Sequence, residues 1–324
     1  MARTAGTPRT SRTRSARTRK ADKGLWECVI VGAGPAGLSA AVYMGRFKRR
    51  TLVLDCGDGR WSYGQINQNY LGFPGGVRAT RLHDLGRKQA ERFGVVFQDA
   101  EVTRVRLDRR GFHLKTAKGI HRARTLIWAA GVRDRWPDFD GAKRLVGRHL
   151  FWCIVCDGWR TRDQRLLVLG NTDACVGTTL QFLTYTRKIT YLCDRTQGRP
   201  SSRARAKLAQ AGIAYVEAKV RRVVVEKDCV RRVVLDDKRT LDADIVFSLY
   251  GSHPRTDLLR DLPVALERNG HIRIDDKNRT NLTAFFAAGD CDSKHSHQVV
   301  TAAHEGAMAA QAANHVLYPA QQRL

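Results

Sequence analysis

Two cysteines near the middle of the chain are spaced for redox chemistry. Cys153 and Cys156 are separated by two residues, and Asp157 follows directly. Thiols at this spacing can close a disulfide, and a neighbouring cation or helix N-terminus would stabilise one of them as the reactive thiolate. The Asp157 carboxyl group could carry a proton to a leaving thiolate. The pattern therefore predicts a catalytic redox pair with an adjacent acid.

Zinc binding and simple core packing are the competing interpretations of this pair. A structural zinc site needs two further ligands at similarly close spacing, and neither a second C-x-x-C nor a suitable histidine pair follows. We therefore expect no metal. Other cysteines are expected to be packing residues, namely Cys28, Cys175, Cys193 and Cys291. Three histidines could supply a proton relay but are expected to be surface groups, namely His295, His297 and His304.

A glycine-rich turn near the N-terminus has the spacing of a dinucleotide-binding site. It follows an apolar run and precedes a helical pattern, and its residues are Gly32, Gly34, Pro35, Ala36 and Gly37. Glycines at these positions allow a tight turn, close approach of the backbone to a pyrophosphate, and close packing of helix on strand. Asp55 ends the next apolar run, where a carboxylate can accept a hydrogen bond from a ribose 2′-hydroxyl. The sequence therefore predicts dinucleotide binding.

The elements around these motifs predict an α/β protein with two nucleotide-binding units. Apolar runs at 28–31 and 51–55 flank the glycine turn and a helical stretch, which gives a right-handed parallel βαβ unit. The same pattern returns as a strand at 165–169, a turn at Gly170, a helix at 175–185 and a strand at 188–193. We expect two nested Rossmann-like dinucleotide-binding domains, the second inserted into the first.

Composition places further limits on the chain. Its 324 residues suffice for two domains, and no apolar run is long enough for a membrane span or a secretory signal, so we expect a cytoplasmic protein with mostly reduced thiols. The formal net charge is +26. Residues 1–23 are rich in Arg, Thr and Ser and are predicted to form a disordered basic tail. A transit peptide or a mis-assigned start would also explain this segment, and nucleic-acid binding through it is a secondary hypothesis.

Together these motifs resemble the low-molecular-weight thioredoxin reductases. The resemblance rests on Gly32–Gly37, the Ala130–Gly131 turn, the Cys153–Gly158 segment, Gly289–Asp290 and the residues from Gln298 onward. It implies a discontinuous FAD-binding domain, residues 24–134 plus 250–324. A pyridine-nucleotide-type domain carrying the cysteine pair, residues 135–249, would be inserted into it.

The resemblance also implies roles for individual residues. Asp290 would bind the ribityl chain of FAD, and Gln298 and Val299 would bring a helix N-terminus to the flavin ring. Cys156 would lie next to the flavin, and Cys153 would exchange with the partner disulfide. Electrons would pass from NADPH through FAD and the cysteine pair to a thioredoxin-like protein, with rotation of the inserted domain between steps. A homodimer is also implied.

The second glycine turn departs from the family pattern. Thr172 stands where the middle glycine would be, and its Cβ would obstruct approach to a pyrophosphate. Asp194 ends the next strand and would repel a 2′-phosphate, which favours NADH, whereas Arg195 and Arg199 keep NADPH possible. Loss of nucleotide binding is the alternative. The chain would then be a dithiol oxidase using oxygen, or a reductase fed by a donor other than nicotinamide.

Overall fold

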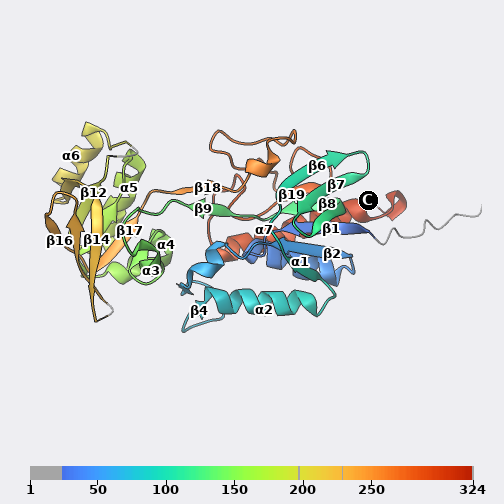
Figure 1. Cartoon of the computed structure of the whole chain (residues 1–324), viewed down its shortest axis with the longest axis horizontal. Coiled ribbons are helices and arrows are strands. Elements are labelled where there is room, and N and C mark those ends of the chain that lie inside the picture. Colours follow the sequence, from blue (N-terminus) through green and yellow to red (C-terminus); the bar gives the residue numbers. More distant parts are fainter. Residues whose placement is uncertain (1–23, 196–197, 228, 323–324) are drawn as a thin grey trace, which may run out of the picture.

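The computed structural model describes residues 24–195, 198–227 and 229–322. The predicted disordered tail, residues 1–23, lies outside this part of the chain. The described residues form two lobes, each built around a largely parallel sheet (Figure 1). Within them, no helix combines the length and the apolar character needed to cross a membrane.

The first lobe contains a seven-stranded sheet. Its order is β5 (Val96–Asp99), β2 (Thr51–Asp55), β1 (Leu25–Val31), β8 (Gly119–Trp128), β7 (Gly111–Thr116) and β6 (Arg104–Asp108), with β19 (Phe285–Ala287) also paired to β8. The strands β5, β2, β1, β8 and β19 pair in parallel, while β7 is antiparallel to both neighbours. Shortly after β19, the chain turns at Gly289, which has a φ of +81°.

Three helices accompany this sheet, α1 (Pro35–Arg46), α2 (Ala79–Glu91) and α7 (Val299–Leu317). Helices α1 and α7 contact each other closely because small residues line their interface. A Cβ added at Gly306 of α7 would lie 2.0 Å from the carbonyl oxygen of Ala36 in α1. The buried apolar residues of both helices form one core with β1 and β2. The glycine turn before α1 is therefore held between the sheet and α7.

The second lobe repeats the strand–turn–helix arrangement. Its five parallel strands are β10 (Leu150–Phe151), β17 (Ile245–Ser248), β11 (Leu166–Leu169), β12 (Ile189–Cys193) and β13 (Ala214–Glu217). One core joins this sheet to α5 (Asp173–Gln181) and α6 (Ser202–Gln210). Another core joins it to an antiparallel sheet made of β14 (Val220–Glu226), β15 (Cys229–Leu235) and β16 (Thr240–Asp242).

Two short strands connect the lobes. The chain leaves the first sheet through β9 (Val132–Asp134) and returns through β18 (Ser252–Pro254), and these pair antiparallel between the lobes (Figure 1). The remaining short elements are β3 (Ile66–Asn67), β4 (Val77–Arg78), α3 (Ala142–Leu145) and α4 (Ile154–Asp157). The predicted fold class is confirmed, since one Rossmann-like unit is inserted into another.

Candidate functional site

The first glycine turn requires glycine at both ends and is open in the middle. Gly32 has a φ of +99°, and a Cβ there would lie 2.3 Å from the carbonyl oxygen of Ala129. A Cβ at Gly37 would lie 1.9 Å from the carbonyl oxygen of Gly32. A Cβ at Gly34 would meet nothing within 4 Å. The outer glycines therefore close the turn, whereas Gly34 leaves space where a ligand can approach the backbone.

Asp55 stabilises the same turn from the end of β2. Its carboxylate accepts hydrogen bonds from the backbone N–H groups of Ala33, at 2.9 Å, and Gly57, at 3.1 Å. Helix α1 begins after Gly34 without a side-chain cap, and Pro35 occupies its first turn. The free N–H groups of such a helix start can bind a phosphate.

A cavity of about 1180 Å³ extends from this turn past the cysteine pair to the start of α5, where Thr172 and Cys175 also line it. It exceeds the roughly 300–1,000 Å³ of common small-molecule pockets, as an elongated dinucleotide would require. The predicted site residues that line it are Gly32, Gly34, Pro35, Ala36, Asp55, Ala130, Gly131, Cys153, Cys156, Asp157, Gly289, Asp290, Gln298 and Val299. The open space above Gly34 and the continuous cavity fit FAD. Of the other predicted residues, Gly37 packs under the turn, and Gly170, Asp194 and Arg195 lie outside the lining.

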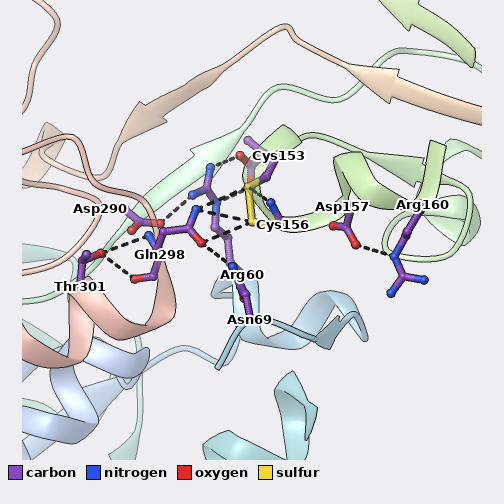
Figure 2. The surroundings of a disulfide bond; sticks show 10 residues. Arg60, Asn69, Cys153, Cys156, Asp157, Arg160, Asp290, Gln298 and Thr301 are labelled. Carbon is purple, nitrogen blue, oxygen red and sulfur yellow. Dashed lines mark hydrogen bonds and ion pairs between the residues drawn. A yellow bond between two sulfur atoms is a disulfide. The ribbon is translucent and has the colours of Figure 1, made fainter. Parts of the chain in front are cut away.

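Cys153 and Cys156 form a disulfide at the wall of this cavity (Figure 2). The backbone N–H of Cys156 donates to Cys153 Sγ at 3.1 Å. Gln298, at the start of α7, places its Nε2 atom 3.5 Å from each sulfur. Asn69 Nδ2 donates to Gln298 Oε1 at 2.9 Å and so fixes this side chain. The disulfide of the second lobe is therefore in contact with the first lobe.

Asp157 is buried and paired with Arg160. Arg160 Nε donates to Asp157 Oδ1 at 2.7 Å, and the pair lies to one side of the sulfurs (Figure 2). Burial raises the pKa of the Asp157 carboxyl group, although Arg160 acts in the opposite direction. A raised pKa suits a proton donor. The catalytic role of Asp157 remains a prediction.

Arg60 is a cavity residue that the sequence reasoning missed. Its Nη1 atom lies 2.7 Å from Asp290 Oδ2, and its Nε donates to Asp134 Oδ2 at 2.9 Å. Burial disfavours the charge of Arg60, but the two carboxylates outweigh this effect and raise its pKa. Its partners are 74 and 230 residues away in the sequence, so no local pattern could identify it.

The second glycine turn is packed against and capped by side chains of the second lobe. A Cβ at Gly170 would lie 2.7 Å from Cys175 Cβ and 2.7 Å from Tyr191 Oη. Thr172 is the N-cap of α5, and its hydroxyl accepts the N–H of Cys175 at 3.2 Å. Asp173 adds a negative charge in the first turn of α5 and accepts hydrogen bonds from Ser201. This helix start is less suited to a phosphate than that of α1.

The residues expected at the ribose or the 2′-phosphate of a nicotinamide nucleotide also interact with other side chains of this protein. Tyr250 Oη donates to Asp194 Oδ2 at 3.1 Å. Arg195 forms an ion pair with Glu217, and Arg199 Nη1 lies 3.8 Å from Glu217 Oε1. The positive charge of these arginines is therefore partly neutralised.

The remaining cysteines are largely placed as expected. Those predicted to pack in the core are buried, namely Cys28, Cys175, Cys193 and Cys291. Cys56 and Cys229 are exposed. Among the histidines, His295 and His304 are exposed, whereas His297 is half-buried and lines the cavity.

The chain is similar in sequence to a known protein family and to proteins that belong to it. A family model described as pyridine nucleotide-disulphide oxidoreductase matches residues 26–307. The chain is 33% identical over 296 residues to the thioredoxin reductase of Treponema pallidum, a match that covers 89% of this chain and 96% of that protein.

Solved structures are similar over nearly the same range. The thioredoxin reductase from Streptococcus pyogenes has a TM-score of 0.84 and 26% identity, covering 91% of this chain and 98% of that chain. The structure named HlmI has a TM-score of 0.82 and 28% identity, covering 91% of this chain and 93% of that chain.

Proposed function

The chain belongs to the low-molecular-weight thioredoxin reductases of the pyridine nucleotide-disulphide oxidoreductase family and is an FAD-dependent thiol:disulfide oxidoreductase; from this premise we propose that it reduces the disulfide of a small thioredoxin-like protein with electrons from a nicotinamide nucleotide. One observation carries the proposal. The Cys153–Cys156 disulfide and the first glycine turn line the same cavity.

We propose that FAD lies along this cavity. The turn at Gly32, Gly34 and Gly37 would hold its pyrophosphate, with Asp55 at the ribose. Other residues would hold the rest of the cofactor, namely Ala130, Gly131, Gly289, Asp290, Gln298 and Val299. When bound, FAD supplies the two-electron relay between a nicotinamide and a disulfide.

The two cysteines would then divide the work of thiol–disulfide exchange. Two electrons and two protons convert the Cys153–Cys156 disulfide to two thiols. Cys153 passes its proton to Asp157 before it attacks, and the proton of Cys156 goes to the second partner sulfur. The Cys153 thiolate attacks the partner's disulfide, which forms a mixed disulfide and releases one partner thiolate, and Asp157 supplies the proton that this thiolate takes up. The Cys156 thiolate attacks Cys153 Sγ, which restores the internal disulfide and frees the second partner thiol. Gln298 would position both sulfurs for these steps.

A protein substrate must reach sulfurs that face the cavity. We propose that residues 135–249 rotate as a domain relative to residues 24–134 plus 250–324, with the β9–β18 pair as the hinge. Such motion about a two-stranded connection is a common form of domain movement. A homodimer in the cytoplasm is the assembly and location that we propose.

We propose NADH as the preferred donor, because Asp194 would accept a ribose hydroxyl and repel a 2′-phosphate. The capped turn at Thr172 supports a second candidate function, in which nicotinamide does not bind. The flavin would then be reduced by substrate dithiols and reoxidised by oxygen.

Anaerobic titration of the FAD-containing protein with NADH and with NADPH tests these functions. We expect NADH to bleach the flavin, and Cys156→Ser to keep this bleaching while abolishing reduction of a thioredoxin disulfide. Cys229→Ser, an exposed cysteine outside the cavity, is the control and should retain full turnover. Bleaching by neither nucleotide, together with oxygen consumption on addition of a dithiol, would establish the oxidase instead.

A further inference from the structure

Three histidines meet beside the start of α7. The side-chain nitrogens available as ligands on His271, His295 and His297 all lie within 4.8 Å of one another. His271 is only 6% exposed, and within the described part of the chain neither of its ring nitrogens has a hydrogen-bond partner. His297 Nε2 is likewise buried without a partner among those residues. Buried polar nitrogens in this state are unfavourable unless another group satisfies them.

The backbone fixes the segments that carry these rings. Ile272 N–H donates to the carbonyl oxygen of Cys291 at 3.0 Å, and Ser293 N–H donates to that of Ile272 at 3.0 Å. These bonds tie the chain after His271 to the chain before His295. The rings of His271 and His295 consequently contact each other, with centroids 4.5 Å apart. The cluster is therefore set by the fold.

A carboxylate completes the set of possible ligands. Glu267 Oε2 lies 3.6 Å from His295 Nε2. The Glu267 N–H donates to the carbonyl oxygen of His271 at 2.8 Å, so the two residues close one tight turn. A carboxylate next to three imidazoles can serve as the fourth ligand or can orient a bound water.

We propose that His271, His295 and His297 bind a zinc ion, with Glu267 or a water at the fourth position. Three imidazoles and one oxygen form a donor set that zinc accepts in tetrahedral geometry, with bonds of about 2.0–2.2 Å. To reach such bonds, the ligand nitrogens need to approach one another by about an ångström or more. The ion would bond to one of the two unpartnered nitrogens of His271 and could bond to Nε2 of His297.

The proposed zinc site lies next to the residue that contacts the disulfide. Gln298 directly follows His297, and its side chain contacts both sulfurs of the disulfide. His295 and His297 also line the cavity that holds the disulfide. A zinc ion here would anchor the segment that presents Gln298, independently of which disulfide the enzyme reduces.

Calorimetric titration of zinc chloride into the full-length, FAD-containing, chelator-treated protein tests the proposal. The protein is kept oxidised, because reduced Cys153 and Cys156 would themselves bind zinc. We expect one zinc ion per chain, with affinity lowered at least about tenfold in His295→Gln and in His297→Gln. His304→Gln, which removes an exposed histidine of α7 outside the cluster, should bind zinc like the wild type.

Two results would overturn the site. One is the absence of zinc binding to the oxidised wild-type protein. The other is equal zinc affinity in the wild type and in both cluster variants. Thermal melting gives an independent readout, because zinc should raise the melting temperature of the wild type and of His304→Gln but not that of the cluster variants.

Discussion

The chain contains two strand–turn–helix units whose turns differ where a dinucleotide phosphate would approach. In the first, α1 begins at Gly34 with no side-chain cap, and space is open above that residue. In the second, Thr172 caps α5 with its own hydroxyl, and Asp173 brings a negative charge. Helix N–H groups that a side chain has already satisfied attract a phosphate less. The two units therefore share a backbone arrangement, but the N–H groups at the start of α1 have no side-chain cap, whereas the start of α5 is capped by Thr172.

The glycines of the two turns also serve different purposes. Gly32 and Gly37 face backbone carbonyl oxygens and shape the first turn itself. Gly170 instead faces the side chains of Cys175 and Tyr191, so its lack of a Cβ permits core packing. A glycine motif in sequence therefore does not distinguish a ligand site from a packing site.

The largest expected effect is the loss of the first turn in Gly37→Ala. The new Cβ would lie 1.9 Å from the Gly32 carbonyl oxygen, which forces the backbone to move. We expect destabilisation of about 3 kcal/mol or more and loss of bound FAD. Thermal melting and the flavin absorbance of the purified protein measure both effects.

Gly34→Ala is the matched control in the same turn. Its Cβ meets no protein atom within 4 Å, so the melting temperature of the FAD-free protein should stay at the wild-type value. FAD affinity should nevertheless fall by at least about tenfold, because the methyl group stands where the pyrophosphate approaches. Unchanged FAD affinity in Gly34→Ala would contradict the proposed position of the cofactor.

The sequence predicted the parts of the site that depend on neighbouring residues. The turn at Gly32–Gly37 and the cysteine pair are recognisable because their chemistry requires fixed local spacing. Arg60 and the contact of His271 with His295 depend on long-range folding, which leaves no local pattern. Helix α2 was also missed, since it is polar and buries only Ala79, His83 and Ala90. Gln298 was expected at the flavin, and its contact with the sulfurs depends on the placement of the lobes.

At the second turn, a substitution is expected to increase nucleotide affinity rather than lower it. Thr172→Gly removes the Cβ and the hydroxyl cap from the start of α5, which makes this turn more similar to the first. We expect a loss of only a few tenths of a kcal/mol in stability, because glycine is tolerated at an N-cap. Affinity for NADH should rise by about tenfold as backbone approach is relieved. Anaerobic flavin-reduction kinetics at increasing NADH concentration measure this change.

Thr172→Ser provides the control for this comparison. It retains a hydroxyl that can accept the N–H of Cys175 and should bind NADH like the wild type. If Thr172→Gly and Thr172→Ser had the same NADH affinity, neither the Cβ nor the hydroxyl cap of residue 172 would be what separates the two turns.

Two buried acids, Asp292 and Glu305, lie next to Gly289, which lines the same cavity as the first turn. Glu305 of α7 accepts the N–H of Gly289 at 2.7 Å, and a Cβ added at Gly289 would lie 2.9 Å from Ala36 Cβ in α1. Asp292 lies close to Glu305, and burial, followed by the charge of Glu305, raises the pKa of Asp292 to about 7. The pKa of Glu305 is raised as well, mainly by burial.

The final prediction follows from the raised pKa of Asp292. The ordinary value for Asp292 is 3.8, so between that value and about 7 the folded chain retains a proton that the unfolded chain has released. The free energy of unfolding therefore falls as the pH rises through this window and levels off above it. Asp292→Asn keeps the Oδ1 atom that accepts the N–H of Lys294 but carries no charge. Its stability relative to the wild type should increase by at least about 1 kcal/mol between about pH 5 and about pH 8.

Denaturant unfolding at the two pH values measures this difference, with the exposed carboxylate variant Asp261→Asn as the control. That control should follow the wild-type pH dependence. A constant difference between Asp292→Asn and the wild type across the window would mean that Asp292 is already ionised in the folded chain. The contrast between the two turns would then rest on Gly34, on the Thr172 cap and on the charge of Asp173, without a contribution from the buried acids.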